Sequence, residues 1–579
     1  MSFRESTSNW QWRYFAADNI PDILGSLDGF IENELPLADG RILKPVFFHF
    51  PESGMINMYD IMEEMPEVSA RTLIIAEFFA EEAGSLFIGF GADWKWTLWH
   101  NGKLLLDALG CRNGEAPIRP TNHSQEIMYT AGRNQIVFEV FGGSYRHPGI
   151  DGGMDVAMQI IENVPTLGMV YQPFVSFPDS WDNAVSVIFC ANRKTPAAVD
   201  YRLQGTEKWL RRYDNLGGQM RHDRAVHSVR LEDLQPDSIY EYRVVLLDDF
   251  RALAELPQEV HTFRTAAAPG QEFSFIATAD LQDPDSRTAY LENLLGKNAP
   301  GENSFFAFIG DLFWTSDFNR SVMDEFVVPF TRIAGEKMPL VMVRGNHEIY
   351  GKDSNRYFEY FTPPYPGREG YYMFRWGDVC FIVLDFCDDE GNVPPPSTRQ
   401  FHDFEVYLAA ESKWLKKAVN EPICRDAKYR IVLAHGVPLG DVEEYMPQNI
   451  RQMIDPVFGG KSPQVQIHLW LGGHIHRPFR SQPLSNKYYS MVPPEIFQKH
   501  KLHPAIGEKY SFPIVITGGP TGALGSNMQF TSIQVKVSAD GLLVSSFDRD
   551  NSLFDSFLIS GKMEVKDITQ STEFREYSF

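Results

Sequence analysis

The sequence predicts a multidomain protein in which two N-terminal β-sandwiches are followed by an α/β domain. A chain of 579 residues is too long for one hydrophobic core. Its first 268 residues alternate short apolar runs with turns, which is typical of all-β domains. From residue 273 onward, apolar runs alternate with helical patterns such as SRTAYLENLLG, and this alternation indicates βαβ units.

The first predicted sandwich covers residues 1–165. RTLIIAEFFA and RNQIVFEVFGG have the composition of strands, and HNGK between two further runs predicts a β-hairpin. GADWKWTLWHNGKLL and the later AGRNQIVFEV resemble galactose-binding-like jelly-roll modules, which makes carbohydrate a candidate ligand. Trp94, Trp96 and Trp99 have the spacing for sugar stacking. We favour the alternative that they cover one face of a sheet, because Trp usually contributes buried area.

The second, smaller sandwich is predicted for residues 166–268, where VSVIFCA, AAVDYRL and SIYEYRVVLLDD form evenly spaced strand-like runs. LEDLQP followed by YEYRV resembles a fibronectin type III domain, in which a Leu and a Pro mark the turn before a Tyr-bearing strand. Its histidines, His222, His227 and His261, are expected at the surface. AAAPGQ then has the composition of a linker.

The α/β domain is predicted to span residues 269–550, and the polar residues 551–579 are expected to form a C-terminal tail. Five apolar runs in the domain end on a residue type that binds metals: Asp280, Asp311, Asn346, His435 and His474. Sheets of this class bind ligands beyond the carboxyl ends of their strands. The five segments are therefore expected to bring these side chains to one rim.

These strand ends resemble the calcineurin-like metallophosphoesterase superfamily over about half of the chain. The family pattern D-x-H, G-D, G-N-H-[ED], lone His and G-H-x-H corresponds to DLQ at 280–282, GDLFW at 310–314, GNHE at 345–348, His435 and GHIH at 473–476. The resemblance implies an α/β metallophosphoesterase sandwich that hydrolyses a phosphate monoester or diester with a metal-activated water. The fibronectin-like domain ahead of it also resembles purple acid phosphatases and their bacterial relatives. Trp314 replaces the iron-ligating tyrosine of that branch, so no ferric-tyrosinate site is expected.

Two divalent ions are expected to share Asp311, because a dinuclear centre needs a bridging carboxylate. Asp280, Gln282 and His476 would complete the first ion, and Asn346, His435 and His474 would complete the second. Nitrogen and oxygen ligands without Cys suit Mn, Fe or Zn and do not distinguish among them. His347, next to a ligand, would be free to protonate the leaving oxygen.

Gln282 departs from the family pattern, which usually has His at this position. An amide oxygen still reaches a metal, so the resemblance implies a first ion that is retained but held less tightly. The alternative is that this ion is lost and the site is mononuclear or vestigial.

Three further groups of residues are weaker candidates for a functional site. Arg344 and Arg477 flank ligands, and either phosphate binding or ion pairs with Asp385 or Glu348 would explain them. His500 and His503 are expected in a solvated or substrate-binding loop rather than at a third metal. TGGPTGALG is rich in Gly but lacks the Lys-Ser or Lys-Thr of a P-loop.

The overall composition of the chain limits the classes of partner and the type of site that are expected. A formal net charge of −23 argues against nucleic acid or an anionic membrane, so a small phosphorylated substrate is expected. The five Cys are scattered without a CxxC pair, which argues against a disulfide framework or a thiolate zinc site. No apolar run is long enough for a membrane span. The N-terminal residues lack the apolar core of a signal peptide, so a cytoplasmic location is expected, or a secreted or periplasmic one if the start was trimmed.

The competing interpretation is a binding protein, in which the sandwiches recognise a glycan or partner and the α/β domain is a weak or inactive scaffold. Both imidazole pairs of the motif are present, and a decayed site has no reason to keep them. This favours the enzyme.

Overall fold

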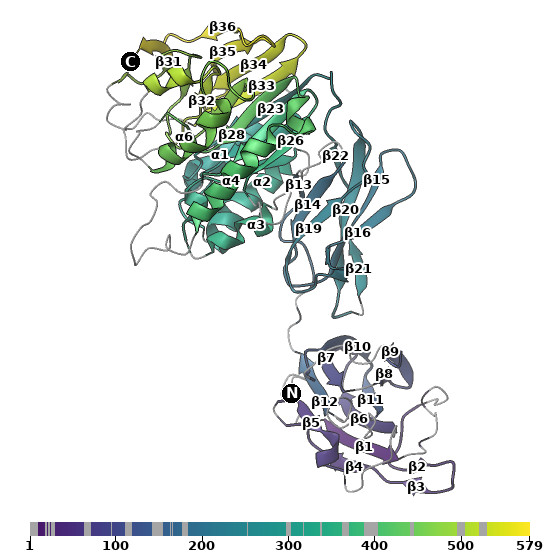
Figure 1. The fold of residues 1–579 in the computed structure, drawn as a ribbon. Coiled ribbons are helices and arrows are strands. Elements are labelled where there is room, and N and C mark those ends of the chain that lie inside the picture. Colours follow the sequence, from purple (N-terminus) through teal and green to yellow (C-terminus); the bar gives the residue numbers. More distant parts are fainter. Residues whose placement is uncertain are drawn as a thin grey trace. The chain divides into compact units, whose positions relative to one another are not determined.

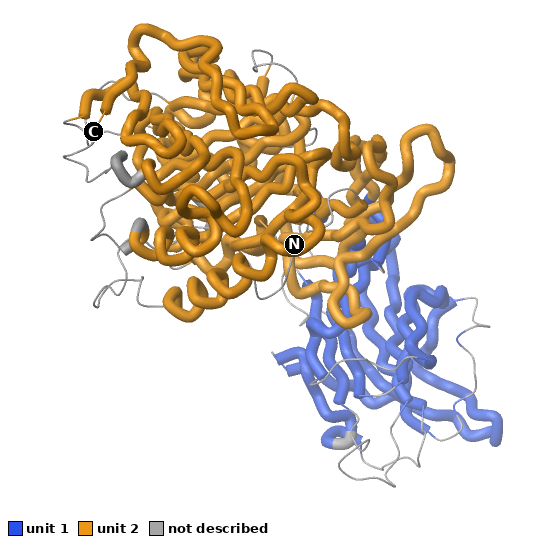
Figure 2. The backbone as a smooth tube through the Cα atoms, turned by 45° about the horizontal axis from the view of Figure 1, so that its top comes forward, with its two compact units in different colours: residues 1–167, 247–256 blue, residues 168–246, 257–579 orange. Residues whose placement is uncertain are grey.

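The computed structural model forms two compact units, which are coloured separately in Figure 2. Unit 1 consists of residues 1–167 and 247–256, and unit 2 of residues 168–246 and 257–579. The structure describes residues 10–17, 20, 24, 29–51, 53–62, 71–93, 95–110, 118–141, 155–161, 164, 166–176, 183–251, 253–296, 303–316, 318–335, 338–351, 353–361, 370–386, 403–439, 445–494, 504–519 and 530–578.

Unit 1 is built from two antiparallel sheets whose inward side chains share one core. The six-stranded sheet contains, in spatial order, β4 (Val46–Phe48), β1 (Gln11–Ala17), β6 (Arg71–Ala80), β11 (Gly132–Phe141), β8 (Trp96–His100) and β9 (Lys103–Asp107). The four-stranded sheet contains β10 (His123–Tyr129), β7 (Gly84–Ala92), β12 (Asp155–Ile161) and β5 (Met55–Asn57), which is followed by the 3₁₀ helix η3 (Met58–Asp60). β2 (Leu35–Pro36) and β3 (Ile42–Leu43) form a separate hairpin.

The predicted hairpin at HNGK is confirmed, since β8 pairs antiparallel with β9 and both Asn101 (φ 48°) and Gly102 (φ 77°) are left-handed. Trp96 is buried against Phe90 and Phe138, with ring centroids 5.0 and 5.8 Å away. Trp96 therefore fills the core. Trp94 lies outside the described residues, and a carbohydrate ligand of this unit stays a prediction.

The accessory part, residues 168–268, contributes strands to two sheets. A five-stranded sheet contains β16 (Leu210–Tyr213), β15 (Ala197–Leu203), β20 (Ile239–Asp248), β21 (Ala254–Pro257) and β22 (His261–Arg264), with the small hairpin β17 (Asn215–Leu216) and β18 (Gln219–Met220) nearby in sequence. Three other accessory strands, β19 (Val226–Leu231), β14 (Val185–Cys190) and β13 (Phe174–Ser176), continue directly into the α/β sheet. The junction is the parallel pairing of β13 with β25 (Leu340–Val343) through Ser176 and Leu340.

Two histidines of the accessory part are buried, contrary to the expectation of surface positions. His227 has no exposed side-chain area and its Nδ1 lies 3.0 Å from Asp214 Oδ2. Its ring stacks on Phe189 at 5.1 Å. His261 is 6% exposed and packs beside Tyr242. The Asp214 carboxylate, 13 residues away in the sequence, supplies a polar partner for the buried His227 ring.

The α/β part of unit 2 consists of two sheets packed face to face (Figure 1). The ten-stranded sheet contains β19 (Val226–Leu231), β14 (Val185–Cys190), β13 (Phe174–Ser176), β25 (Leu340–Val343), β24 (Phe305–Ile309), β23 (Phe273–Thr278), β33 (Ser532–Ser538), β34 (Gly541–Phe547), β35 (Leu553–Ile559) and β36 (Val565–Gln570). The eight-stranded sheet contains β26 (Tyr372–Trp376), β27 (Val379–Leu384), β28 (Tyr429–Ala434), β29 (Leu469–Gly472), β32 (Ile514–Ile516), β30 (Phe479–Ser481), β31 (Lys487–Ser490) and β37 (Arg575–Ser578). Phe275 and Phe305 of the first sheet meet Phe381 of the second at 5.2 and 5.5 Å.

Helices cover the outer faces of both sheets. α1 (Pro284–Leu295), the π-helical η4 (Phe318–Val327), α2 (Val328–Phe330), η5 (Thr331–Gly335) and α3 (Tyr357–Tyr360) belong to the first layer, whereas α4 (Phe404–Ala418), α5 (Pro422–Arg425) and α6 (Tyr445–Phe458) pack on the second. The short helices η6 (His347–Ile349), η7 (Ser354–Arg356) and η9 (Pro504–Lys509) lie in connections. Among the helices in the described residues, none has the length and apolar character needed to cross a bilayer.

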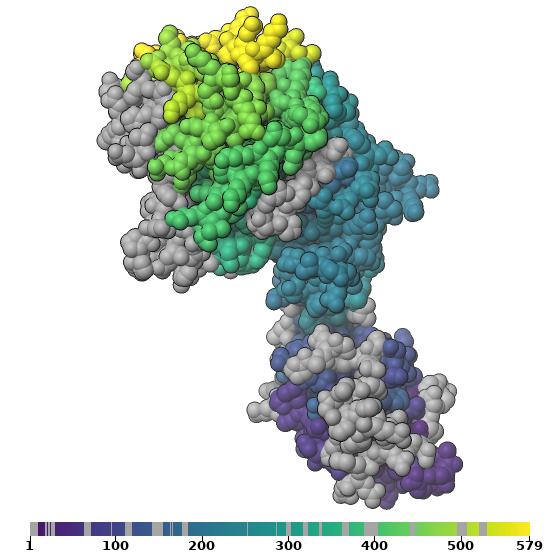
Figure 3. Space-filling model, viewed as in Figure 1, coloured from purple at the N-terminus to yellow at the C-terminus, as the bar shows by residue number. Residues whose placement is uncertain are grey.

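Residues 553–578 do not form the expected separate tail. β35 and β36 extend the ten-stranded sheet, and β37 pairs with β31 at the edge of the eight-stranded sheet. These residues are yellow on the surface of unit 2 in Figure 3. The sequence of Val565–Gln570 is polar because this segment is an outer strand with mostly exposed side chains.

Candidate metal centre

The parallel strands of both sheets end close together and carry the predicted ligands. β23, β24 and β25 are parallel in one sheet, and β28 and β29 are parallel in the other. Each of these strands is buried on both faces, which explains its continuous apolar sequence. The first polar side chains after four of them are those of Asp280, Asp311, His435 and His474, and Asn346 follows β25 after Arg344 and Gly345.

Four of the predicted ligands have left-handed backbone conformations, which cost energy for residues other than Gly. They are Asp280 (φ 57°), Asp311 (φ 60°), His474 (φ 69°) and His476 (φ 56°). Such strain persists only where the surroundings enforce it, and it is frequent at functional sites. Gly345 makes room for this backbone, because a Cβ there would lie 2.6 Å from the Asp311 amide nitrogen and 2.9 Å from Glu348 Oε2.

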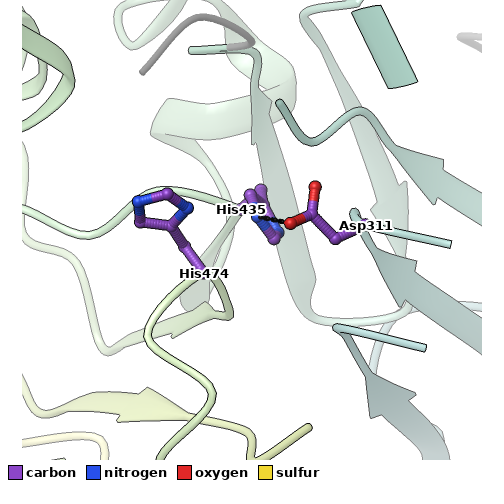
Figure 4. Close-up of side chains that lie close together, drawn as sticks. All are labelled: Asp311, His435 and His474. Atoms are coloured by element: carbon purple, nitrogen blue, oxygen red, sulfur yellow. Dashed lines mark ion pairs between the residues drawn. The ribbon is translucent and has the colours of Figure 1, made fainter. Parts of the chain in front are cut away.

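Two groups of three ligand residues share Asp311. One group is Asp311, His435 and His474, and the other is Asp280, Asp311 and His476; within each group the ligand atoms lie within 4.8 Å of one another. His435 Nε2 lies 3.1 Å from Asp311 Oδ2, and His476 Nε2 lies 3.4 Å from Asp280 Oδ1. Figure 4 shows His435 between His474 and Asp311, with its ion pair to Asp311 dashed.

Asn346 lies against the first of these groups. Its Oδ1 is 3.1 Å from His474 Nδ1, and its Nδ2 donates to the Tyr350 hydroxyl at 3.1 Å. The backbone N–H of His474 donates to Asp280 Oδ1 at 3.0 Å, which connects the two groups.

Gln282 is buried beside both carboxylates. Its Nε2 donates to Asp311 Oδ2 at 3.0 Å and lies 3.4 Å from His476 Nε2. Within the described part of the chain, Gln282 Oε1 and Asp280 Oδ2 are buried without a hydrogen-bond partner. Buried acceptors normally have partners, so these two oxygens, on residues of the two ligand groups, fit a cation as the missing partner. The donor set therefore fits divalent metal.

Burial and charge pairing inside the centre shift three pKa values in the metal-free protein. Burial raises the pKa of Asp280 to about 7. Burial also opposes the charge on Asp311, but the His435 ring outweighs it and holds the pKa of Asp311 below its usual range. Burial alone would lower the pKa of His435, whereas the Asp311 carboxylate raises it to about 10. A bound cation would replace the proton on His435, because a ligand imidazole must be neutral.

His347 is placed beside Asp311 and keeps one ring nitrogen toward it. Its backbone N–H donates to Asp311 Oδ1 at 3.0 Å. Its Nδ1 lies 2.9 Å from the Trp314 carbonyl oxygen, which can only accept, so Nδ1 carries a proton. The other nitrogen, Nε2, is 3.9 Å from Asp311 Oδ2.

Glu348 and Arg287 support the ligand turns and were not singled out for this by the sequence. The buried Glu348 carboxylate accepts from the backbone N–H groups of Asp311 (2.9 Å), Leu312 (2.7 Å) and Gly345 (2.6 Å). The buried Arg287 donates to the carbonyl oxygens of Leu281, at 3.2 Å, and Leu312. The acidic position of GNHE was the available signal for Glu348; Arg287 had none.

Arg344 forms an ion pair, which is one of the two explanations that the sequence left open for it. Its Nη2 lies 2.8 Å from the buried Asp385 Oδ2, which also accepts from the Tyr407 hydroxyl at 2.8 Å. Arg477 is buried, and its Nη1 donates to the His476 carbonyl oxygen at 3.3 Å. His500, His503 and most of TGGPTGALG lie outside the described residues. The three cysteines in the described part, Cys190, Cys380 and Cys424, form no disulfide.

Comparison with known proteins agrees with this geometry. Residues 273–478 match the family model of the calcineurin-like phosphoesterases. Purple acid phosphatase 1 of Ipomoea batatas is 24% identical over 324 residues, which are 52% of this chain and 60% of that protein. The chain thus matches less than two thirds of the length of this relative.

Two solved structures are similar over most of their length. Purple acid phosphatase PPD1 from seeds of yellow lupin (Lupinus luteus) is 14% identical and covers 85% of this chain and 93% of its own, with a TM-score of 0.46. A structure of PhoD is also 14% identical and covers 71% of this chain and 94% of its own, with a TM-score of 0.47. These values are too low to carry a functional argument.

Proposed function

We propose that the chain hydrolyses a phosphate ester at a centre of two divalent metal ions, on the premise that residues 273–478 match the family model of the calcineurin-like phosphoesterases. One observation carries the proposal. Two ligand groups share Asp311, and beside them lie two buried oxygen atoms without a hydrogen-bond partner among the described residues.

The first ion would be held by Asp280, Gln282, Asp311 and His476, and the second by Asp311, Asn346, His435 and His474. Mn, Fe or Zn suits this set of nitrogen and oxygen donors. Bound ions would polarise a phosphoryl oxygen and lower the pKa of a water molecule.

His347 supplies the proton for the leaving group in this proposal. Water forms the new bond to phosphorus and releases one proton to the solvent, from which His347 is later reprotonated, and the bond from phosphorus to the leaving oxygen breaks with its electron pair on that oxygen. The oxygen takes the proton of His347 Nε2, while the Trp314 carbonyl holds Nδ1 in place. The geometry around His347 supports this role, because its Nε2 faces the bridging carboxylate.

The test combines metal content with turnover of a panel of phosphomonoesters and phosphodiesters in the presence of Mn, Fe or Zn. Asp311→Asn and His474→Ala are expected to lose both metal and activity. His222→Ala is a matched control, because His222 is exposed in the accessory part. A wild-type protein that binds no metal and stays inert after metal addition would refute the proposal and favour the binding protein.

A further inference from the structure

Trp314 is exposed at the edge of the candidate metal centre. Its side chain is 51% exposed, although it follows the buried residues Asp311, Leu312 and Phe313. Large aromatic side chains usually gain stability from burial. Among the other described tryptophans, Trp99, Trp209 and Trp414 are partly buried, and five are at most 4% exposed: Trp10, Trp12, Trp96, Trp376 and Trp470. An exposed indole at this position therefore calls for a partner from solution.

The indole is in contact with the proposed proton donor. The Trp314 and His347 rings meet edge to face, with centroids 5.3 Å apart and an interplanar angle of 79°. Tyr350 contacts the same imidazole, with centroids 5.0 Å apart. His347 is thus held between two aromatic rings, and the more exposed of the two is Trp314.

We infer that Trp314 determines substrate specificity by stacking on a flat ring in the leaving group, so that aromatic or heteroaromatic phosphate esters are preferred. This inference rests on the proposed function, in which His347 protonates the leaving oxygen. That oxygen must come within about 2.6–3.2 Å of His347 Nε2. Because the Trp314 and His347 ring centroids are 5.3 Å apart, a ring one or two bonds from that oxygen can reach the 4.5–7 Å at which aromatic pairs attract.

The ligand chemistry follows from the indole itself. Its π surface favours another flat ring over a puckered ring of the same size, because only the flat ring makes full face contact. A gain of about 3- to 10-fold in affinity or in kcat/KM is expected from one aromatic pair. Simple aryl esters and nucleotides both offer such a ring, and they differ in how far it lies from the phosphorus.

The experiment compares benzyl phosphate with cyclohexylmethyl phosphate, which have the same kind of leaving oxygen and differ in the shape of the ring. Wild type, Trp314→Phe and Trp314→Leu are assayed with added Mn. Trp314→Leu is expected to lower kcat/KM for the benzyl ester about 3- to 10-fold and to leave the cyclohexylmethyl ester within about twofold. Trp314→Phe should retain most of the preference. Trp209→Leu, in the accessory part beside Arg202 and Arg243, is the control.

Binding of benzylphosphonate and cyclohexylmethylphosphonate, measured by calorimetry with Mn present, gives a readout that needs no turnover. Equal losses for both compounds in Trp314→Leu, or no loss, would overturn the inference. Absence of turnover with a Trp314-dependent preference for benzylphosphonate would overturn the proposed hydrolysis but keep the stacking role. Absence of both would overturn both.

A further arm compares AMP with ribose 5-phosphate. A loss in Trp314→Leu that is specific to AMP would assign the ring to a nucleobase, whereas a loss confined to the benzyl compounds would assign it to a ring close to the leaving oxygen, as in arylmethyl esters.

Discussion

Gly345→Ala is predicted to weaken metal binding by displacing the bridging carboxylate. The new Cβ would lie 2.6 Å from the Asp311 amide nitrogen, whereas ordinary contacts begin at 3.4 Å. One of the two segments would therefore have to move by about 0.8 Å. Metal sites tolerate about 0.2 Å in their ligand distances. Overpacking of this kind costs about 1–3 kcal/mol. If this free energy is lost from the metal-bound state, the affinity for metal falls about 5- to 150-fold.

The assay is a titration of the metal-loaded protein with a competing chelator, with metal content read by elemental analysis. Gly168→Ala is the matched control, because a Cβ at Gly168 meets nothing within 4 Å. Circular dichroism checks that both variants fold. If Gly345→Ala holds metal as tightly as wild type and Gly168→Ala, the close packing of Gly345 against Asp311 does not position the ligand.

The remaining predictions concern three other residues. His347→Ala is expected to keep its metal but slow turnover by about 10²- to 10⁴-fold, most for poor leaving groups; a loss independent of leaving-group acidity would exclude the acid role. Gln282→His should tighten the weaker of two phases in a metal titration of the metal-free protein, and identical titration curves would show that Gln282 is not a ligand. Burial lowers the pKa of His468 to about 4, and its Nδ1 accepts from the Arg430 N–H at 3.1 Å. A histidine with a depressed folded-state pKa contributes stability above its ordinary pKa near 6.5, and this stability is lost as pH falls toward 4. His468→Gln should therefore flatten the fall in melting temperature between these values, and an unchanged slope would contradict this assignment.

The strand ends could be predicted because runs such as Phe305–Ile309 are buried on both faces and stop abruptly at a polar residue. The spacing and the type of the side chains within each run are enough to predict where the strand ends. The resemblance to a known family then indicated which polar residues would meet. The roles of these residues as ligands and acid stay predictions until metal and turnover are measured.

Long-range partners could not be predicted in the same way. The Glu348 carboxylate accepts hydrogen bonds from three backbone N–H groups. One belongs to Gly345, which is nearby in sequence, and the other two belong to Asp311 and Leu312 at the end of another strand. His227 looked exposed because its partner Asp214 lies on a different segment. The single pairing of Ser176 with Leu340, which joins the accessory strands to the α/β sheet, has no signature in either segment.

The position of β33 to β37 in the sequence has a consequence for synthesis. A nascent chain already contains every proposed ligand once His476 has been made, but β23 still lacks its neighbour β33 (Ser532–Ser538). The edge strand β31 likewise waits for β37. Pairings between such distant segments form slowly because the intervening chain must first be closed into a loop. Metal loading is therefore expected after translation rather than during it. A chain truncated before Ser532 should retain no metal, and retention at the full-length level would show that the ligand turns form without these strands.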